Sequence, residues 1–259
     1  MSTTGSLVSA AERLRVLHHG PHPLILPNVW DPVSARAFAD AGFAALATSS
    51  AAVAATLGYR DGQTPGAEML GAVARIARSV SVPVTADIEN GYGLAPAGLA
   101  ARLADAGVVG CNLEDSDPAT GELTDPERQA DFLAAVRAAA GPALVVNARV
   151  DVFVRGAGRS ADAGAHNATD EAVARAGRYL AAGADCVYPI LAPPAALAEL
   201  VRRVDGPVNA LLAPGGPGIS ELAGLGVARI TFGGGLHHRA AQAVRELAAG
   251  LAAEADAIG

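Results

Sequence analysis

Two acidic segments of this chain each follow a short apolar run, and their residue types could hold a metal ion. Asp87 and Glu89 end one such run, and Glu114 and Asp115 end another. Residues two apart on an extended backbone point to the same face, so the first two carboxylates should lie together. Because the candidate ligands are all oxygen atoms, the cluster favours Mg²⁺ or Mn²⁺ over zinc. We therefore predict a metal centre at Asp87, Glu89 and Glu114, with Asp115 as a further candidate.

A hard cation held by these acids would suit one class of chemistry. It could chelate a 2-oxo acid through its carboxylate and keto oxygens and act as a Lewis acid toward a developing enolate. Arg149 adds a planar cation that can grip a carboxylate or phosphonate with two hydrogen bonds, and an ion pair with one of the acids is the alternative. Ser49 and Ser50 could direct backbone N–H groups at an anionic oxygen, or cap the helix that follows.

These residues need a scaffold that brings strand ends together, and the chain contains eight strand candidates. Helical patterns of about 10 to 15 residues separate them, for example at 68–80, 131–140 and 170–182. A helix end, a glycine and a strand recur in that order at several places, and such joints imply parallel strands. We predict a single (β/α)₈ barrel, with a doubly wound sheet as the alternative. The predicted strands are 24–26, 44–48, 84–87, 110–113, 144–149, 186–189, 208–211 and 229–232.

The predicted barrel is one domain over residues 1–259, with an N-terminal helix within 1–20 and a C-terminal helix at 236–257. In such barrels the active site lies at the carboxyl ends of the strands. Two long connections on that face, 49–65 and 151–168, are lid candidates. The residues placed on that face are Asn28, Trp30, Asp31, Ser49, Ser50, Asp87, Glu89, Asn90, Glu114, Asp115, Arg149, Asp151, Tyr188, Asn209 and Gly233.

Composition narrows the classes of partner. Apolar residues make up 51% of the 259 residues, which is enough for a sizeable core, and aromatics only 4%, which disfavours a base-stacking platform. The net charge of −7 argues against nucleic acid or an anionic membrane as partner. The chain shows no secretory leader and no apolar run long enough to span a bilayer, so we expect a cytoplasmic protein. Cys111 and Cys186 lie in apolar runs and are expected to be buried free thiols.

Taken in order, several segments resemble the isocitrate lyase/phosphoenolpyruvate mutase superfamily. They are 28–31, 49–50, 57–61, 87–93, 110–115 and 147–151, and the resemblance extends over roughly residues 24–240. It implies a barrel enzyme that acts on 2-oxo or 2-hydroxy carboxylates through a Mg²⁺-bound enolate. It also implies a homo-oligomer, a dimer or tetramer, in which the C-terminal helix is exchanged between subunits.

The resemblance assigns roles to individual residues. It implies that Asp87 binds the metal directly, and that Glu89, Glu114 and Asp61 hold metal-bound waters. It further implies that Ser49 binds substrate or enolate oxygens and that Arg149 clamps the substrate. The catalytic candidates are therefore Arg149, Ser49, Glu114 and Asp61, and the substrate-contact candidates are Trp30, Ser49, Ser50, Asp61, Asn90, Gly91, Arg149 and Tyr188.

Because of two departures from the superfamily pattern, the sequence does not decide which bond of the substrate the enzyme would break. Lyases of this group carry a lid signature whose cysteine serves as acid–base residue, and the mutases have a longer lid with lysine and asparagine. Segment 116–125 here has no lysine, cysteine, asparagine or histidine, and nothing near Tyr188 matches the mutase histidine. We predict a Mg²⁺-dependent lyase or decarboxylase of a small 2-oxo or 2-hydroxy acid. The alternatives are a mutase or hydrolase acting on a carbon–phosphorus bond, and a catalytically silent barrel that binds 2-oxo acids.

Overall fold

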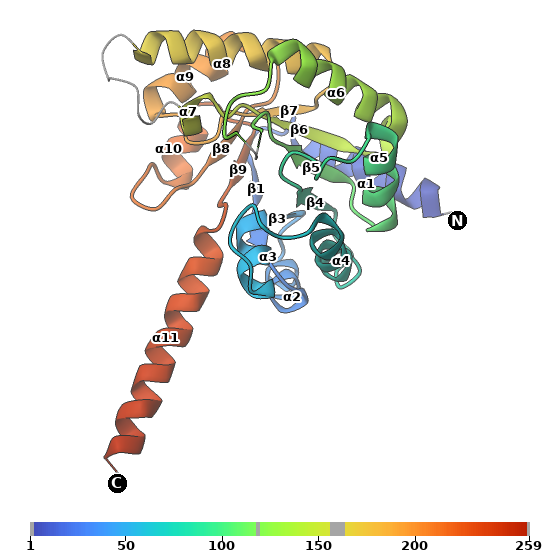
Figure 1. Ribbon diagram of the computed structural model, residues 1–259. Helices are drawn as coiled ribbons and strands as arrows, with labels where there is room; N and C mark the ends of the chain where they lie inside the picture. The colour runs from blue at the N-terminus through green and yellow to red at the C-terminus, as the bar shows by residue number, and fades with distance from the viewer. Residues whose placement is uncertain (1–2, 118–119, 156–163, 258–259) are drawn as a thin grey trace.

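Parallel strands follow one another round a barrel, with helices outside them (Figure 1). The computed structural model describes residues 3–117, 120–155 and 164–257. The strands are β1 (Leu24–Leu26), β2 (Asn28–Val29), β3 (Leu46–Thr48), β4 (Val84–Asp87), β5 (Gly110–Leu113), β6 (Val145–Arg149), β7 (Cys186–Tyr188), β8 (Asn209–Leu211) and β9 (Arg229–Thr231).

The strand pairings in the described residues lead from each strand to the next and back to the first. Strands β2 to β7 pair in sequence order, and β1, β9 and β8 pair in that order. Pro27, which has no backbone N–H to donate, separates β1 from β2, so these two form one interrupted strand position. A single parallel bridge between Val187 and Val208 joins β7 to β8. The arrangement confirms the predicted parallel α/β fold of the (β/α)₈ type, with eight strand positions among the described residues.

The helices connect successive strands as expected, but three begin earlier than predicted. Asp125 explains one case: its Oδ1 accepts hydrogen bonds from the N–H groups of Glu127 and Arg128, at 3.1 and 3.0 Å, and so caps the helix before the apolar pattern becomes visible. The helices are α1 (Thr3–Leu17), α2 (Pro32–Asp40), α3 (Ser50–Leu57), α4 (Gly66–Ala77), α5 (Pro96–Asp105), α6 (Pro126–Ala140), the 3₁₀ turn η1 (Gly141–Ala143), α7 (Val152–Arg155), α8 (Gly164–Ala181), α9 (Pro194–Arg203), α10 (Ile219–Gly224) and α11 (Gly235–Asp256).

The N-terminal helix covers the amino end of the barrel. Its buried residues Ala11 and Leu14 form a small apolar cluster with residues at the starts of the strands, including Leu24, Ala45 and Val145. A larger core lies between the strands and the outer helices. The carboxyl ends of the strands are therefore left as the face on which loops can build a site.

Gly110, the first residue of β5, is required by a close approach inside the barrel. A Cβ atom at this position would lie 2.7 Å from Oγ1 and 2.9 Å from Cβ of Thr85 on the neighbouring strand. Because neither strand can shift freely, we expect Gly110→Ala to lower the free energy of unfolding by about 1–3 kcal/mol. Gly71→Ala, in a helix where a Cβ meets nothing within 4 Å, is the matched control and should be neutral or stabilising. Urea denaturation of both variants measures the difference, and equal stabilities would contradict the contact.

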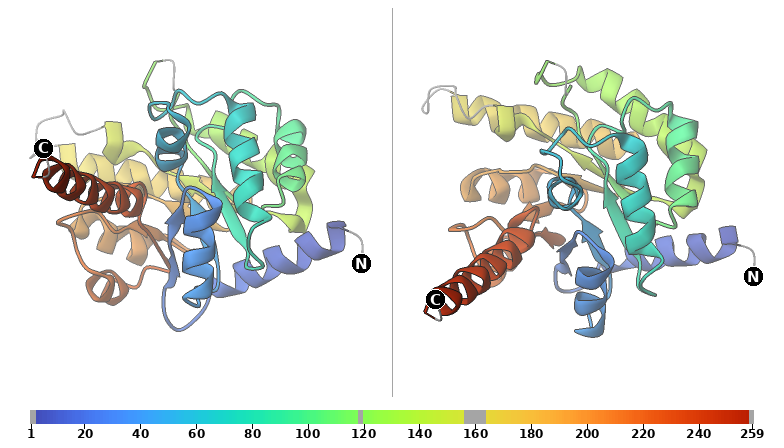
Figure 2. Two further views of the ribbon diagram at one scale, coloured as in Figure 1. Left: turned by 90° about the horizontal axis from the view of Figure 1, so that it is seen from below. Right: turned by 60° about the horizontal axis from the view of Figure 1, so that its bottom comes forward.

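The last helix, α11, extends away from the barrel in Figure 1 and in the right-hand view of Figure 2, and none of its described residues is buried. Its exposed apolar residues are Val244, Leu247 and Leu251. Among the described residues, no helix has the length and hydropathy that crossing a membrane requires.

Candidate metal and substrate site

Asp87 ends β4 with one carboxylate oxygen fixed and the other left for a ligand. Its Oδ2 accepts hydrogen bonds from the backbone N–H of Ser50 at 3.0 Å and from the Ser50 hydroxyl at 2.8 Å. The backbone N–H of Asp87 donates to Thr48 Oγ1 at 2.9 Å, which fixes the end of the strand. Oδ1 is buried and has no hydrogen-bond partner. A buried carboxylate oxygen without a donor fits direct coordination of a cation.

Ser49 and Ser50 begin α3, and both are buried. The Ser49 side chain accepts a hydrogen bond from the N–H of Ala52 at 3.3 Å, so the N-cap alternative holds for this residue. Ser50 supplies both hydrogen bonds to Asp87. The helix start therefore orients the carboxylate.

The turn after β4 directs Glu89 toward the same place. Glu89 and Tyr92 adopt positive φ angles of 52° and 55°, a backbone region that non-glycine residues seldom occupy and that clusters at functional sites. Asn90 Oδ1 accepts a hydrogen bond from the N–H of Tyr92 at 3.2 Å, and the Tyr92 hydroxyl donates to Glu89 Oε1 at 3.4 Å. At Gly91 a Cβ would lie 3.1 Å from Leu99 Cδ2. Asn90 and Gly91 thus shape the turn that positions Glu89.

Arg149, at the end of β6, lies among three groups of the site. Its Nη1 donates to Glu114 Oε1 at 2.5 Å, and its Nε donates to Asp151 Oδ1 at 2.8 Å. The guanidinium carbon lies 6.0 Å from the ring centre of Tyr188, which is 3% exposed. Arg149 therefore forms the ion pair with an acid of the site that the sequence indicates as the alternative to substrate binding. A guanidinium has five N–H donors, so these contacts leave donors for a substrate.

Burial, reinforced by neighbouring negative charge, raises the pKa of three acids of the site. Burial raises the pKa of Glu114 to about 8, an effect that Arg149 opposes and the Asp87 charge reinforces. Burial, then the charges of Asp87 and Asp61, raise the pKa of Glu89 to about 7. Asp61, at the exposed rim, also has a raised pKa, through loss of hydration and the charge of Asp87. These raised values indicate a cluster of negative charge that a divalent cation would relieve.

The geometry fits an ion that keeps much of its own hydration. Within 3–117, 120–155 and 164–257, no three His, Cys, Asp or Glu side chains converge closely enough to hold a metal ion together. Over the described part of the chain, Asp87 alone offers a buried carboxylate oxygen without a hydrogen-bond partner. One direct carboxylate, with Glu89 and Glu114 within electrostatic reach, suits Mg²⁺, which is reluctant to lose its waters.

Asp115, the fourth acidic candidate, is engaged in a buried network instead. Its Oδ1 accepts a hydrogen bond from the N–H of Asp151 at 2.8 Å, and its Oδ2 accepts from Tyr179 at 2.7 Å and from Arg175 at 3.1 Å. The Ser116 hydroxyl donates to Asp151 Oδ2 at 2.6 Å. Because Asp151 in turn holds Arg149, this network fixes the direction of the guanidinium. Sequence reasoning missed Arg175 and Tyr179, whose only local signal is their four-residue spacing on one helix face.

Three further candidates on this face make contacts within the protein. Asn28 joins the first strand position to the turn after β9: its Oδ1 accepts from the N–H groups of Phe232 at 2.7 Å and Gly233 at 3.1 Å. Asp31 caps α2 by accepting from the N–H of Ser34 at 2.7 Å. The Trp30 ring lies edge-on to the His237 ring, with centroids 5.2 Å apart.

The predicted lid candidates 49–65 and 151–168, and the segment after β5 that departs from the superfamily pattern, differ in how far they can be described. The first candidate, 49–65, contains α3 and lies wholly within the described residues. After β5 the chain forms a short hairpin, in which Ser116 and Leu123 are bridged and Thr124 N–H donates to Asp115 O at 2.7 Å. Residues 118–119 of this hairpin lie outside the described residues. The other lid candidate, 151–168, includes α7 and the start of α8, and its central part, 156–163, is outside them as well.

The raised pKa values of Glu89 and Glu114 predict opposite pH trends for stability and metal affinity. Since the folded state holds these protons more tightly than the unfolded chain, where both values lie near 4.5, the metal-free protein should lose stability as the pH rises from about 5 to above 8. Mg²⁺ competes with the same protons, so its affinity should increase over pH 6 to 8.5. Thermal melts and calorimetric Mg²⁺ titrations across this range measure both trends. A metal affinity independent of pH would contradict the assignment, and Glu89→Gln should flatten the dependence near pH 7.

Comparisons with known proteins identify the family and agree with the fold. The profile described as phosphoenolpyruvate phosphomutase matches residues 14–252. A Corynebacterium glutamicum protein described as probable 2-methylisocitrate lyase 2 is 34% identical over 79% of this chain and 68% of its own length. A crystal structure of a proposed phosphonomutase from Burkholderia cenocepacia is 42% identical, with a TM-score of 0.83 over 94% of this chain and 99% of that one. A phosphonopyruvate hydrolase structure, in complex with oxalate and Mg²⁺, is 25% identical, with a TM-score of 0.81 over 98% and 88%.

Proposed function

This chain belongs to the phosphoenolpyruvate mutase family, and on that premise we propose that it is a Mg²⁺-dependent lyase of a small 2-oxo or 2-hydroxy carboxylic acid. The reaction would cleave a carbon–carbon bond or remove carboxylate through an enolate. One observation carries the proposal: Asp87 has one oxygen fixed by Ser50 and the other buried without a partner. Bound Mg²⁺ would supply a Lewis acid beside that oxygen.

The chain's own residues would bind the substrate and handle the proton. The N–H groups of Arg149 that remain beside its bonds to Glu114 and Asp151 would bind the substrate carboxylate. Glu89, with a pKa near 7, can hold or release a proton at neutral pH. The further substrate contacts that we propose are Trp30, Ser49, Asp61, Asn90, Gly91 and Tyr188.

The usual acid–base groups of this superfamily are not available to this chain. It contains no lysine, and its two cysteines, Cys111 and Cys186, are fully buried. Burial raises the pKa of both thiols to about 12, so neither exchanges protons readily near pH 7. Lysine and cysteine therefore cannot supply the proton, which leaves the carboxyl groups of the site, a histidine such as His237 beside Trp30, or water.

A second candidate is cleavage or rearrangement of a carbon–phosphorus bond, favoured by the likeness to the Burkholderia phosphonomutase and by the oxalate complex of the phosphonopyruvate hydrolase. Product analysis separates the two. Release of pyruvate or glyoxylate from a panel of 2-hydroxy diacids supports the lyase. Inorganic phosphate or an isomerised product from phosphonopyruvate, with no turnover of the diacids, would overturn it in favour of the second candidate. Binding without turnover of either panel would contradict both and leave the silent barrel.

We also propose that the protein is a homo-oligomer in which α11 packs on a neighbouring subunit. The support is that α11 extends from the barrel with Val244, Leu247 and Leu251 exposed, 65%, 65% and 58% respectively. Exposed apolar side chains in line on one helix usually mark a protein interface. Sedimentation should detect a dimer or tetramer that dissociates when all three become serine. An oligomer unchanged by this triple substitution would exclude α11 from the interface.

A further inference from the structure

Arg229 lies inside the barrel, and no carboxylate of the described residues forms an ion pair with it. It begins β9 and is 0% exposed. Its Nη2 contacts Asn112 Oδ1 on β5 at 3.4 Å, and since β9 and β5 are not neighbours in the pairing order, the side chain must cross the barrel interior. Its Nε and Nη1 have no hydrogen-bond partner. A buried guanidinium whose N–H groups lack acceptors lowers the stability of the folded protein, so these N–H groups require a hydrogen-bond partner.

Other unpartnered polar atoms share the interior with Arg229. Asn209 was predicted on the catalytic face, but it begins β8 as the register partner of Arg229, 0% exposed, and its buried Nδ2 has no acceptor. Asn147 donates its Nδ2 to Asn112 at 2.7 Å, and its Oδ1 is buried without a donor. Thr85 Oγ1, which lies against Gly110, is also unpartnered. Branched apolar side chains usually fill this layer of a barrel, so the polar set is a departure from the common packing.

Buried polar atoms without a hydrogen-bond partner also lie at both ends of the barrel. At the amino end, His18 is 4% exposed, and its Nδ1 lies 2.8 Å from the carbonyl oxygen of Leu14. Since a carbonyl only accepts, Nδ1 carries the proton in the neutral ring and Nε2, which is unpartnered, is an acceptor. At the carboxyl end, Asp87 Oδ1 is the corresponding unpartnered acceptor.

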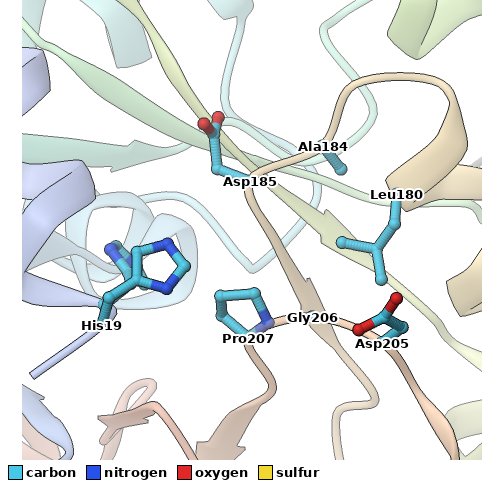
Figure 3. A pocket seen from close by; sticks show the side chains of 8 residues that line it. His19, Leu180, Ala184, Asp185, Asp205, Gly206 and Pro207 are labelled. Carbon is cyan, nitrogen blue, oxygen red and sulfur yellow. The ribbon is translucent and has the colours of Figure 1, made fainter.

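His18 also lines a pocket of about 550 Å³ on the amino-terminal face. Figure 3 shows its neighbour His19 in the wall of the same pocket. The pocket lies between the end of α1 and the turns that lead into β7 and β8, with Asp185 and Pro207 among its walls (Figure 3). His18 therefore lies between the buried amino end of the barrel and a hollow on the face opposite the metal site.

The mixture of donors and acceptors identifies the ligand class. Arg229 and Asn209 offer unpartnered donors, whereas His18, Asn147 and Asp87 offer unpartnered acceptors. A bound anion would satisfy only the donors. The Cys186 thiolate is disfavoured as a counter-ion for Arg229, because burial inside the barrel raises the pKa of this thiol to about 12. Water satisfies both kinds, with about three hydrogen bonds per buried molecule.

We propose that the barrel interior around Arg229 binds a cluster of buried water molecules that joins His18 at the amino end to Asp87 at the metal site. The cluster hydrates the guanidinium and gives water a route to the site that does not cross the loops of the catalytic face. Because a fixed positive charge repels a hydronium ion, the route carries water rather than excess protons.

The test counts long-lived internal waters by ¹⁷O and ²H magnetic relaxation dispersion. It uses protein free of metal and substrate, so its result is independent of the proposed activity. A chain of this size is expected to hold roughly ten buried waters, so the difference between variants is informative. Arg229→Met removes three unpartnered N–H donors and should release about two waters. Arg36→Met, at an exposed arginine, is the matched control and should release none.

Thr85→Val, which keeps the side-chain shape, provides a second variant if Arg229→Met does not fold, and should release about one water. Dispersion unchanged in the folded variants would overturn the proposal. Crystals grown in bromide give an independent check through anomalous scattering. A bromide peak beside Arg229 would overturn the water cluster in favour of an anion site, and ordered water oxygens there would support it.

Discussion

Asp87→Asn should weaken Mg²⁺ binding by more than about 100-fold, because loss of an outer-shell partner alone costs 10- to 100-fold and Asp87 is assigned direct contact. The same change should stabilise the metal-free protein, since the charge of Asp87 raises the pKa of Glu89, Glu114 and Asp61. A variant that melts at a higher temperature yet fails to bind metal cannot be explained by misfolding.

Mn²⁺ titration followed by electron paramagnetic resonance measures the affinity, and thermal melts in chelator measure the stability. Asp40→Asn, at an exposed helix end, is the matched control and should change neither. Retained metal affinity in Asp87→Asn would remove Asp87 from the metal site. Ser50→Ala should give a smaller loss of affinity, because it removes the 2.8 Å hydroxyl contact to Asp87 and keeps the backbone one.

Arg149→Met should produce the largest loss of stability among the site variants. It leaves the carboxylates of Asp151 and Glu114, which are 1% and 21% exposed, without their cation. Removal of one partner from a buried ion pair costs about 3–5 kcal/mol, which corresponds to roughly 10 °C in melting temperature for a chain of this size. Turnover should also be lost, because the substrate carboxylate would lose its bidentate partner.

Arg178→Met is the matched control, since its ion pair with Glu127 is exposed and should be worth under about 1 kcal/mol. Adding Asp151→Asn to Arg149→Met should recover part of the lost stability without recovering turnover, because the amide needs no cation. Differential scanning calorimetry and the product assay measure the two quantities. Equal melting temperatures for Arg149→Met and Arg178→Met would contradict the structural role of the ion pairs.

Local sequence patterns were enough to predict the strands and the acids at their ends. Three strands, 24–26, 84–87 and 110–113, begin and end as predicted because apolar runs there stop at clear breaks. Asp87, Glu89 and Glu114 follow from the same breaks. The family and the fold were also predicted, and the comparisons confirm them.

Contacts between residues distant in sequence were beyond prediction. Asp115 has the same local setting as Glu114, but it pairs with Arg175 and Tyr179, 60 and 64 residues later, and this excludes the role of an available ligand. The role of Ser50 in holding Asp87 depends on a contact across 37 residues. In the sequence, Arg229 is not distinguished from other strand residues. Only its contact with Asn112, 117 residues away, shows that its side chain crosses the barrel interior.

The most direct test of the central claim is a calorimetric titration of the wild-type protein with oxalate, a planar analogue of the enolate, in the presence and absence of Mg²⁺. The proposed site predicts binding that requires Mg²⁺, with Asp87→Asn showing none. Oxalate binding of equal strength without Mg²⁺, or no binding in its presence, would contradict a metal-assisted enolate site at Asp87.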